Sequence, residues 1–148
     1  MSVLEAIGNT SMVRLRKVVP SGCADIFVKL EWENPTGSVK DRMAQSVIAH
    51  AEADGRLKPG DTVVEYTVRP PLFDSTVVDQ IVPVGSDDAK SMARRIAHEE
   101  ALFAGTSSGA NVLAAIEVAQ RLGAGAKVVT LMVDSGLKYL GTDVYRGR

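Results

Sequence analysis

Lys40 is the residue of this chain whose surroundings point most directly to chemistry. It lies in the stretch 31-EWENPTGSVKDRMAQSVIAHAE-52, where a Pro/Gly/Ser loop leads directly into an amphipathic helix. The unpaired N–H groups and the positive dipole end of a helix N-terminus disfavour a second positive charge. An amine held there is shifted toward its neutral form, which can attack an aldehyde and form a Schiff base. We therefore expect the Lys40 amine to be shielded at the mouth of a crevice.

The same loop has a purely structural interpretation. Asn34 and Pro35 favour an extended turn, and Gly37 allows close approach of the backbone. Ser38 is a candidate N-cap for the helix that follows. Most lysines are solvated surface charges, so a well-capped helix with an exposed lysine explains the residue types equally well.

Strand and helix patterns alternate along the chain, which predicts an α/β fold with right-handed crossovers and helices on both faces of a parallel sheet. In such sheets ligands bind beyond the carboxyl ends of strands. The loop 134-DSG-136 and the loop that contains Ser107 are therefore expected to face one crevice, with Asp134 as a candidate wall or a simple turn former. The predicted strands are 25–31, 62–66, 77–84 and 127–133, and the predicted helices are 40–54, one capped by Ser86, and 110–122.

Composition narrows the class of protein. The chain has 148 residues, enough to bury one core without disulfides or metal. A net charge of −1 gives no basic stripe, which argues against nucleic acid as the main partner. Cys23 is the only cysteine, and His50 and His98 lack a metal-spaced partner, so no metal site is predicted. No apolar run approaches a membrane span, and the chain is expected to be cytoplasmic.

Three segments of the N-terminal half resemble the cysteine synthase family, which includes cystathionine β-synthase, of fold-type II pyridoxal phosphate enzymes. They are 7-IGNTSMVRL-15, 28-VKLEWENPTGSVKDRMA-44 and 63-VVEYT-67. In that family the lysine of the N-P-T-G-S-V-K-D-R string carries the cofactor as a Schiff base. The resemblance thus implies that Lys40 is the catalytic, cofactor-binding lysine.

The C-terminal half resembles the last third of the same family. The matching segments are 70-PPLFDSTVVDQIVPV-84, 103-FAGTSSGANVLAAIEVAQRLG-123 and 128-VVTLMVDSGLKYLGTDVY-145. The family serine that corresponds to Ser107 hydrogen-bonds the pyridine nitrogen of the cofactor, so the resemblance implies that Ser107 also binds it. The alternative from the residues alone is that Ser107 or Ser108 only caps a helix that begins near Gly109, and capping and cofactor contact can coexist.

The central part of the family pattern is missing. After Thr67 the family continues into an S-G-N-T-G type loop that holds the substrate carboxylate, and later into a G-T-G-G-T type loop that holds the cofactor phosphate. Here Thr67 is followed at once by 68-VRPPLFDST-76. None of the thirteen glycines forms a phosphate-binding motif, and the densest runs are 105-GTSSG-109 and 123-GAG-125.

The resemblance implies one truncated domain over residues 1–148, in which 1–67 matches the family's N-terminal part and 68–148 its C-terminal part. The expected fold is a three-layer parallel-sheet remnant of the fold-type II, tryptophan synthase β-like, architecture. The implied activity is β-elimination or replacement on O-acetylserine-type amino acids with pyridoxal 5'-phosphate, impaired by the missing loops. Two alternatives stay open: a non-catalytic remnant, and an interaction module that forms homo-oligomers through exposed sheet edges.

Overall fold

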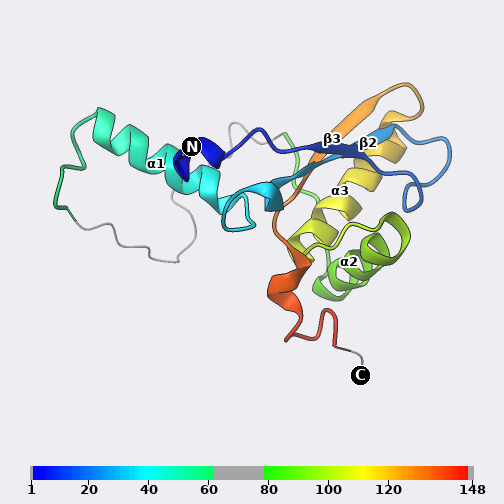
Figure 1. Ribbon diagram of the computed structural model, residues 1–148. Helices are drawn as coiled ribbons and strands as arrows, with labels where there is room; N and C mark the ends of the chain where they lie inside the picture. The colour runs from blue at the N-terminus through cyan, green and yellow to red at the C-terminus, as the bar shows by residue number, and fades with distance from the viewer. Residues whose placement is uncertain (1, 62–78, 147–148) are drawn as a thin grey trace.

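The computed structural model describes residues 2–61 and 79–146, and a three-stranded sheet lies at its centre (Figure 1). The strands are β1 (Met12–Arg14), β2 (Asp25–Leu30) and β3 (Lys127–Met132), in the spatial order β1-β2-β3. β1 is antiparallel to β2, whereas β2 and β3 run parallel in register from Asp25 opposite Lys127 to Leu30 opposite Met132. Two segments more than 90 residues apart in sequence thus become neighbours.

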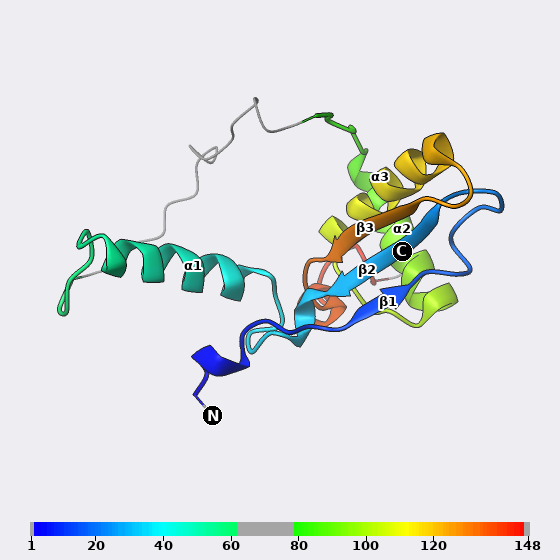
Figure 2. The ribbon, with the colours of Figure 1, turned by 90° about the horizontal axis from the view of Figure 1, so that it is seen from above.

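The α/β class is confirmed, but the described sheet is mixed, because β1 runs against its neighbour. Helices α2 (Ser86–Glu100) and α3 (Thr106–Leu122) both lie on one face of this sheet (Figures 1 and 2). Within the described ranges no helix covers the opposite face, so the expected helices on both faces are not seen there.

The alternation of β2 explains which face is covered. Ile26, Val28 and Leu30 are buried, while the residues between them are half-buried on the other face. The buried side chains meet Met92 and Ile96 of α2 together with small residues of α3 in one hydrophobic core.

Helices α2 and α3 pack unusually closely at Gly109. A β-carbon at this position would lie 2.0 Å from the carbonyl oxygen of Ala89 and 2.8 Å from the backbone nitrogen of Ala93. Only glycine permits this approach, so Gly109 sets the distance between the two helices.

Helix α1 (Lys40–Ala53) extends away from the rest of the described chain (Figure 2). Met43 and Val47 are each 60 % exposed, and Ile48 is 37 % exposed. Its boundaries agree with the predicted helix over 40–54, and Gly55 follows with a positive φ of 74°.

Several sequence predictions need correction. Residues 79–84 form no strand, although 77–84 was expected to be one; residues 77–78 and the predicted strand 62–66 lie outside the described residues. The three-residue strand β1 was not predicted, because so short a run has no readable alternation. Ser86 is the first residue of α2 and not its cap, a position that Gly85 holds without a side-chain hydrogen bond.

Among residues 2–61 and 79–146, every helix falls short of the length and apolar character that a membrane span requires. The cytoplasmic location stays a prediction.

Candidate functional site

The loop before α1 is held by its own polar side chains. The Asp41 carboxylate accepts hydrogen bonds from the backbone N–H of Thr36, at 2.8 Å, and from the Thr36 hydroxyl. Gly37 has a φ of 74°, which favours glycine. Ser38 is buried, and its hydroxyl accepts the Lys40 N–H at 3.3 Å, although the helix cap itself is Val39. These contacts place Lys40 at the first position of α1.

A buried polar cluster around Glu31 attaches the base of α1 to the sheet. Glu31 is 2 % exposed and accepts hydrogen bonds from Thr10 at 2.8 Å, Asn34 at 2.9 Å and Arg42 at 2.7 Å. Burial by itself raises the pKa of Glu31, but these hydrogen bonds and the positive charge of Arg42 together lower it below its ordinary value. Because Arg42 belongs to the first turn of α1, this cluster orients the helix that carries Lys40.

The end of β3 connects the Lys40 loop to the Ser107 loop. The carbonyl oxygen of Val133 accepts the N–H of Val39 at 2.9 Å. The N–H of Val133 donates to the hydroxyl of Ser108, also at 2.9 Å. Lys40 and Ser107 are each the immediate chain neighbour of a residue bound to Val133. Both loops thus adjoin the end of β3, while the expected crevice between the 134–136 loop and the Ser107 loop stays a prediction.

Neighbouring residues extend this connection. The N–H of Ser135 donates to Gly37 at 3.3 Å, and the N–H of Gly105 donates to the carbonyl oxygen of Asp134 at 3.2 Å. A β-carbon on Gly105 would lie 2.5 Å from a carboxylate oxygen of Asp134 and 2.3 Å from the Tyr139 ring. Gly105 is thus required for the close approach of the Ser107 loop to the segment that contains Asp134 and Tyr139.

Ser107 and Ser108 have different surroundings. Helix α3 begins at Thr106 with Gly105 as its N-cap and no side-chain cap, so neither serine caps a helix near Gly109. Ser108 is fully buried and bound to Val133, whereas the Ser107 side chain is exposed on the first turn. The Ser107 hydroxyl makes no hydrogen bond to another described residue, which leaves it available to a ligand.

The Lys40 side chain is exposed, so the predicted shielding at the mouth of a crevice is wrong. Its amine makes no ion pair or hydrogen bond within residues 2–61 and 79–146.

Asp134 lies between the two loops, and Tyr139 is a partner that the sequence did not reveal. One carboxylate oxygen of Asp134 accepts the Tyr139 hydroxyl at 2.7 Å, and the other is buried without a hydrogen-bond partner among the described residues. Burial, followed by the bond to Asp134, raises the pKa of Tyr139 to about 12. The short 3₁₀ helix η4 (Gly136–Tyr139) returns the tyrosine to the aspartate five positions earlier, and this spacing was the only available signal.

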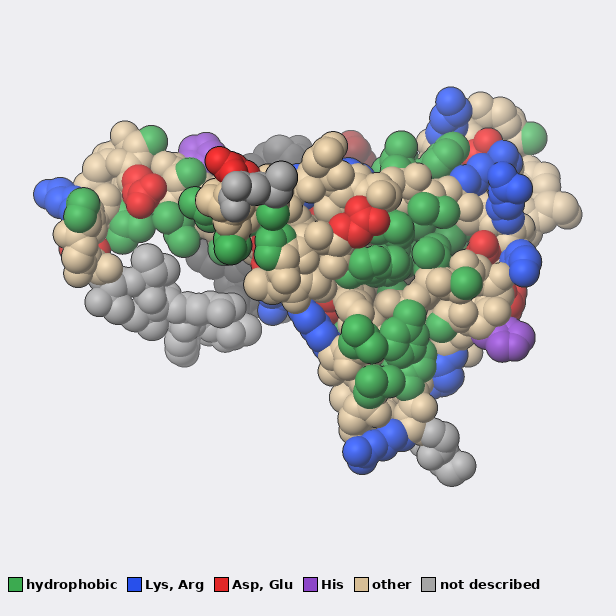
Figure 3. Space-filling view, viewed as in Figure 1, with side chains coloured by type: hydrophobic (Ala, Val, Ile, Leu, Met, Phe, Trp, Pro, Cys, Tyr) green, Lys and Arg blue, Asp and Glu red, His purple; other side chains and the backbone are tan. Residues whose placement is uncertain are grey.

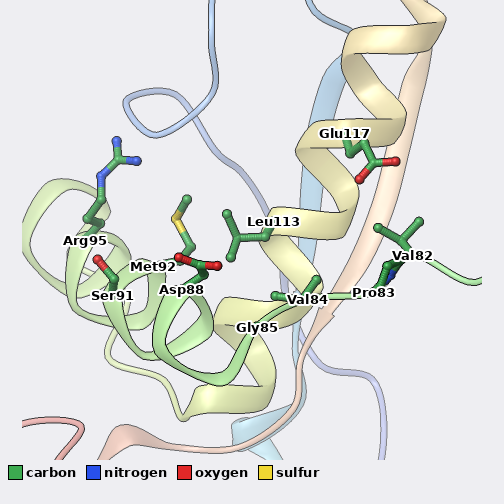
Figure 4. A pocket seen from close by; sticks show the side chains of 10 residues that line it. All are labelled: Val82, Pro83, Val84, Gly85, Asp88, Ser91, Met92, Arg95, Leu113 and Glu117. Carbon is green, nitrogen blue, oxygen red and sulfur yellow. The ribbon is translucent and has the colours of Figure 1, made fainter.

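Two clefts of the described surface are lined by other residues. One, of about 340 Å³, lies between α2, α3 and the segment 82–85; Met92 and Leu113 lie next to each other in it (Figure 4). Another, of about 320 Å³, borders α1 and includes Ala44. Neither is lined by Lys40 or Ser107.

The remaining candidate residues add no further site. His50 and His98 are exposed, and Cys23 is half-buried as a free thiol. Within the described ranges no group of His, Cys, Asp and Glu side chains could hold a metal ion.

Comparison with known proteins links this geometry to a family. Residues 3–68 match the family described as "Pyridoxal-phosphate dependent enzyme". The cysteine synthase of Staphylococcus aureus (strain Mu50) is 53 % identical over 66 residues, a match that covers 45 % of this chain and 21 % of that protein. The O-ureido-L-serine synthase of Streptomyces lavendulae is 54 % identical over 66 residues, covering 45 % and 20 % respectively. The sequence match thus spans about a fifth of the length of the curated relatives.

The fold extends the likeness beyond this N-terminal part. The crystal structure of cysteine synthase from Entamoeba histolytica superposes with a TM-score of 0.84 at 18 % identity, covering 99 % of this chain and 91 % of the solved one. At this identity the superposition shows the fold alone. Residues 3–68 are thus similar in sequence to pyridoxal-phosphate-dependent enzymes, cysteine synthases among them, and the chain shares the fold of a solved cysteine synthase.

Proposed function

We propose that this chain keeps the lysine end of a cysteine synthase-type site and captures pyridoxal 5'-phosphate at Lys40, with little turnover of amino acids. The observation that supports the proposal best is the backbone of Val133, whose C=O binds Val39 beside Lys40 and whose N–H binds Ser108 beside Ser107. The Lys40 loop and the Ser107 loop, which both bind the cofactor in the family, are thereby attached to the end of β3.

The residues present fit the aldehyde and the ring of the cofactor but not its phosphate group. Lys40 offers an amine without a described partner, and Ser107 offers a free hydroxyl at the first turn of α3. A phosphate dianion needs several converging N–H donors, usually from a Gly-rich turn. Of the two densest glycine runs, 105-GTSSG-109 carries Ser107, and 123-GAG-125 follows the end of α3. The phosphate group therefore lacks a dedicated loop, and we expect weak, reversible capture.

The roles of the chain's own groups follow from their chemistry. Lys40 would hold the cofactor through its amine and, once released, accept a proton from the α-carbon of an amino acid. The Ser107 hydroxyl would orient the ring by a neutral hydrogen bond. When bound, the cofactor supplies an electron sink for a carbanion. Replacement at the β-carbon of O-acetylserine-type substrates is the matching reaction, but the loop that would hold the substrate carboxylate is missing.

Borohydride trapping tests capture directly. The full chain is incubated with pyridoxal 5'-phosphate, reduced with borohydride and digested, and the modified lysines are located by mass spectrometry. We expect Lys40 to carry most of the label, and Lys40→Arg to lose it.

Lys138 provides the matched control. Its side chain approaches the same loop, with Cε 3.9 Å from where a β-carbon of Gly37 would lie. Lys138→Arg should leave the labelling of Lys40 unchanged. Equal labelling of Lys40 and Lys138, or labelling spread over all lysines, would show non-specific chemistry of surface amines and refute the proposal.

A second candidate function is self-association as an interaction module. It is favoured by the apolar surface of the described chain: hydrophobic side chains gather along α1 and over the main body (Figure 3). In α1, the exposed Met43, Val47 and Ile48 share one face with Ala44 and Ala51, which is the pattern of a helix that packs on a partner. Sedimentation equilibrium should show a homo-oligomer whose mass rises with concentration, and a monomer at every concentration would exclude this role.

A further inference from the structure

The start of α3 is attached to the segment that follows β3. Gly105, the N-cap of α3, is buried, and its N–H donates to the carbonyl oxygen of Asp134 at 3.2 Å. The preceding Ala104 forms an isolated bridge with Ser135. Because Ser107 is only two residues beyond Gly105, these contacts fix the backbone from which the Ser107 side chain projects.

Two side chains of the same segment close on Gly105. A β-carbon on Gly105 would lie 2.3 Å from Cε2 and 2.8 Å from Cζ of Tyr139, the ring atoms at its hydroxyl end. It would also lie 2.5 Å from one carboxylate oxygen of Asp134. The other carboxylate oxygen accepts the Tyr139 hydroxyl at 2.7 Å. Asp134 and Tyr139 are thus bonded to each other and packed against the N-cap of α3.

The charges of this pair suit its position. A carboxylate near the N-terminus of a helix is favourable, because it faces the positive end of the helix dipole. Burial, followed by the hydrogen bond to Asp134, raises the pKa of Tyr139 to about 12. The tyrosine therefore keeps its proton at neutral pH and continues to donate it to Asp134.

The buried side of the first turn of α3 has separate attachments. Ser108 accepts the Val133 N–H at 2.9 Å, and Gly109 packs on the backbone of α2. These contacts hold the helix to the sheet and to α2, whereas the Asp134–Tyr139 pair acts at the N-cap. Hydrogen bonds weaken steeply when their angle falls below about 120°. A small rotation of this turn is thus enough to weaken a bond between Ser107 and a ring that Lys40 holds in place.

We propose that Asp134 and Tyr139 position Ser107 for the cofactor ring, by fixing the N-cap of α3 in the orientation in which the Ser107 hydroxyl bonds the pyridine nitrogen. This inference rests on the proposed capture of pyridoxal 5'-phosphate at Lys40. Both residues act through Gly105 and the turn that follows it, without touching the cofactor. The alternative is a role in packing alone, and the two roles differ in their dependence on the ring nitrogen.

A double-mutant cycle between Tyr139 and Ser107 tests the proposal. Capture by the full chain is measured as the fraction of Lys40 labelled after borohydride reduction, over a range of cofactor concentrations. Ser107→Ala loses the bond to the ring and should need roughly fivefold more cofactor for half-labelling. Tyr139→Phe keeps its ring against Gly105 but loses the hydroxyl, and should show a loss of up to the same size. The double variant should be no weaker than Ser107→Ala alone, because the bond that Tyr139 supports is already absent.

The outcomes separate this role from the proposed function. Losses that multiply in the double variant would mean that Tyr139 and Ser107 act independently, and would overturn the positioning role. Capture by Tyr139→Phe equal to that of the parent chain would overturn it too. A parent chain without specific labelling of Lys40 would refute the proposed function itself, and the positioning role with it.

A cofactor analogue without the ring nitrogen distinguishes positioning from packing. The 1-deaza analogue of pyridoxal 5'-phosphate has a C–H group in place of the pyridine nitrogen and keeps the aldehyde and the phosphate. The parent chain, Ser107→Ala and Tyr139→Phe should capture it equally, because Ser107 then has nothing to bond. If Tyr139→Phe weakens capture of the analogue as much as capture of the cofactor, the tyrosine only packs and the proposal is refuted.

Two further variants separate position from stability. Ala114→Gly lies in α3 beyond its first turn, so it should destabilise the chain but leave capture by the folded protein unchanged. An equal loss of capture in Ala114→Gly would assign the effect to stability and contradict the proposal. Asp134→Asn still accepts the Tyr139 hydroxyl and tests the pair even where Tyr139→Phe fails to fold. It should weaken capture of the cofactor about twofold, because the bond loses its charge, and leave capture of the analogue unchanged; an equal loss for both ligands would count against positioning.

Discussion

The contact between Tyr139 and Asp134 is the residue-scale feature that is simplest to measure. The pKa of Tyr139 is raised to about 12 by burial and by the hydrogen bond to Asp134. Because this value exceeds the ordinary 10.0 of an unfolded tyrosine, the contact stabilises the folded chain fully below about pH 10. That contribution is lost as the pH rises toward 12.

Phenolate absorbance against pH measures this shift. The difference between the parent chain and Tyr139→Phe should titrate well above an ordinary tyrosine, and Tyr145→Phe serves as a control with its own buried hydroxyl. A difference curve centred near 10 would mean that the Asp134 contact does not form in solution.

Residue types predicted part of this site. Lys40 and Ser107 were proposed as site residues because they belong to recognisable strings, and their roles stay predictions. Val133 was not, because its contribution consists of one backbone N–H and one backbone C=O, which every residue except proline possesses. A contact of this kind leaves no trace in the residue type.

At the scale of elements, the connection between α2 and α3 contains a strained residue. Ala101 ends α2 with a φ of 58°, in the left-handed region that favours glycine. Ala101→Gly should therefore raise the free energy of unfolding by about 1 kcal/mol. In thermal unfolding this corresponds to a rise of about 2–4 °C for a chain of this size.

The opposite result is expected inside a helix. Ala114→Gly in α3 should lower the free energy of unfolding by about 1 kcal/mol, because the position is helical and glycine there costs backbone entropy. If both glycines destabilise the chain equally, Ala101 is not strained in solution.

The helices and strands that could be predicted from the sequence were those with a clear alternation or helical spacing of apolar residues. β2 and the three α-helices have clear alternation or helical spacing, and their positions agree with the sequence patterns to within a few residues. Residues 79–84 have the apolar character of a strand but no neighbour to pair with among the described residues. A strand is defined by its pairing, so composition alone could not decide this case.

At the scale of the whole molecule, α1 is attached mainly through its first turn. Asp41 and Arg42 bind the preceding loop and Glu31, whereas the apolar residues of the later turns are exposed. A helix of 14 residues is only marginally stable without packing. The amides of the second half of α1 should therefore exchange with solvent much faster than those of α3 at low protein concentration.

Hydrogen exchange read by NMR checks this expectation. The buried turns of α3 around Val112 and Ala115 provide the internal reference. Equal protection of α1 and α3 in dilute protein would show that another part of the chain covers α1, and would remove its exposed face from the association surface.

The sequence by itself determined the local features: a lysine at the start of a helix, a serine at the start of another, the alternation of β2, and the family to which residues 3–68 are related. These depend on neighbouring residues and on matching strings. Only the tertiary structure decided that β3 lies beside β2, that Val133 connects the two loops, and that the Lys40 side chain is exposed. Such features depend on contacts between segments far apart in the chain, and no local pattern of residues specifies them.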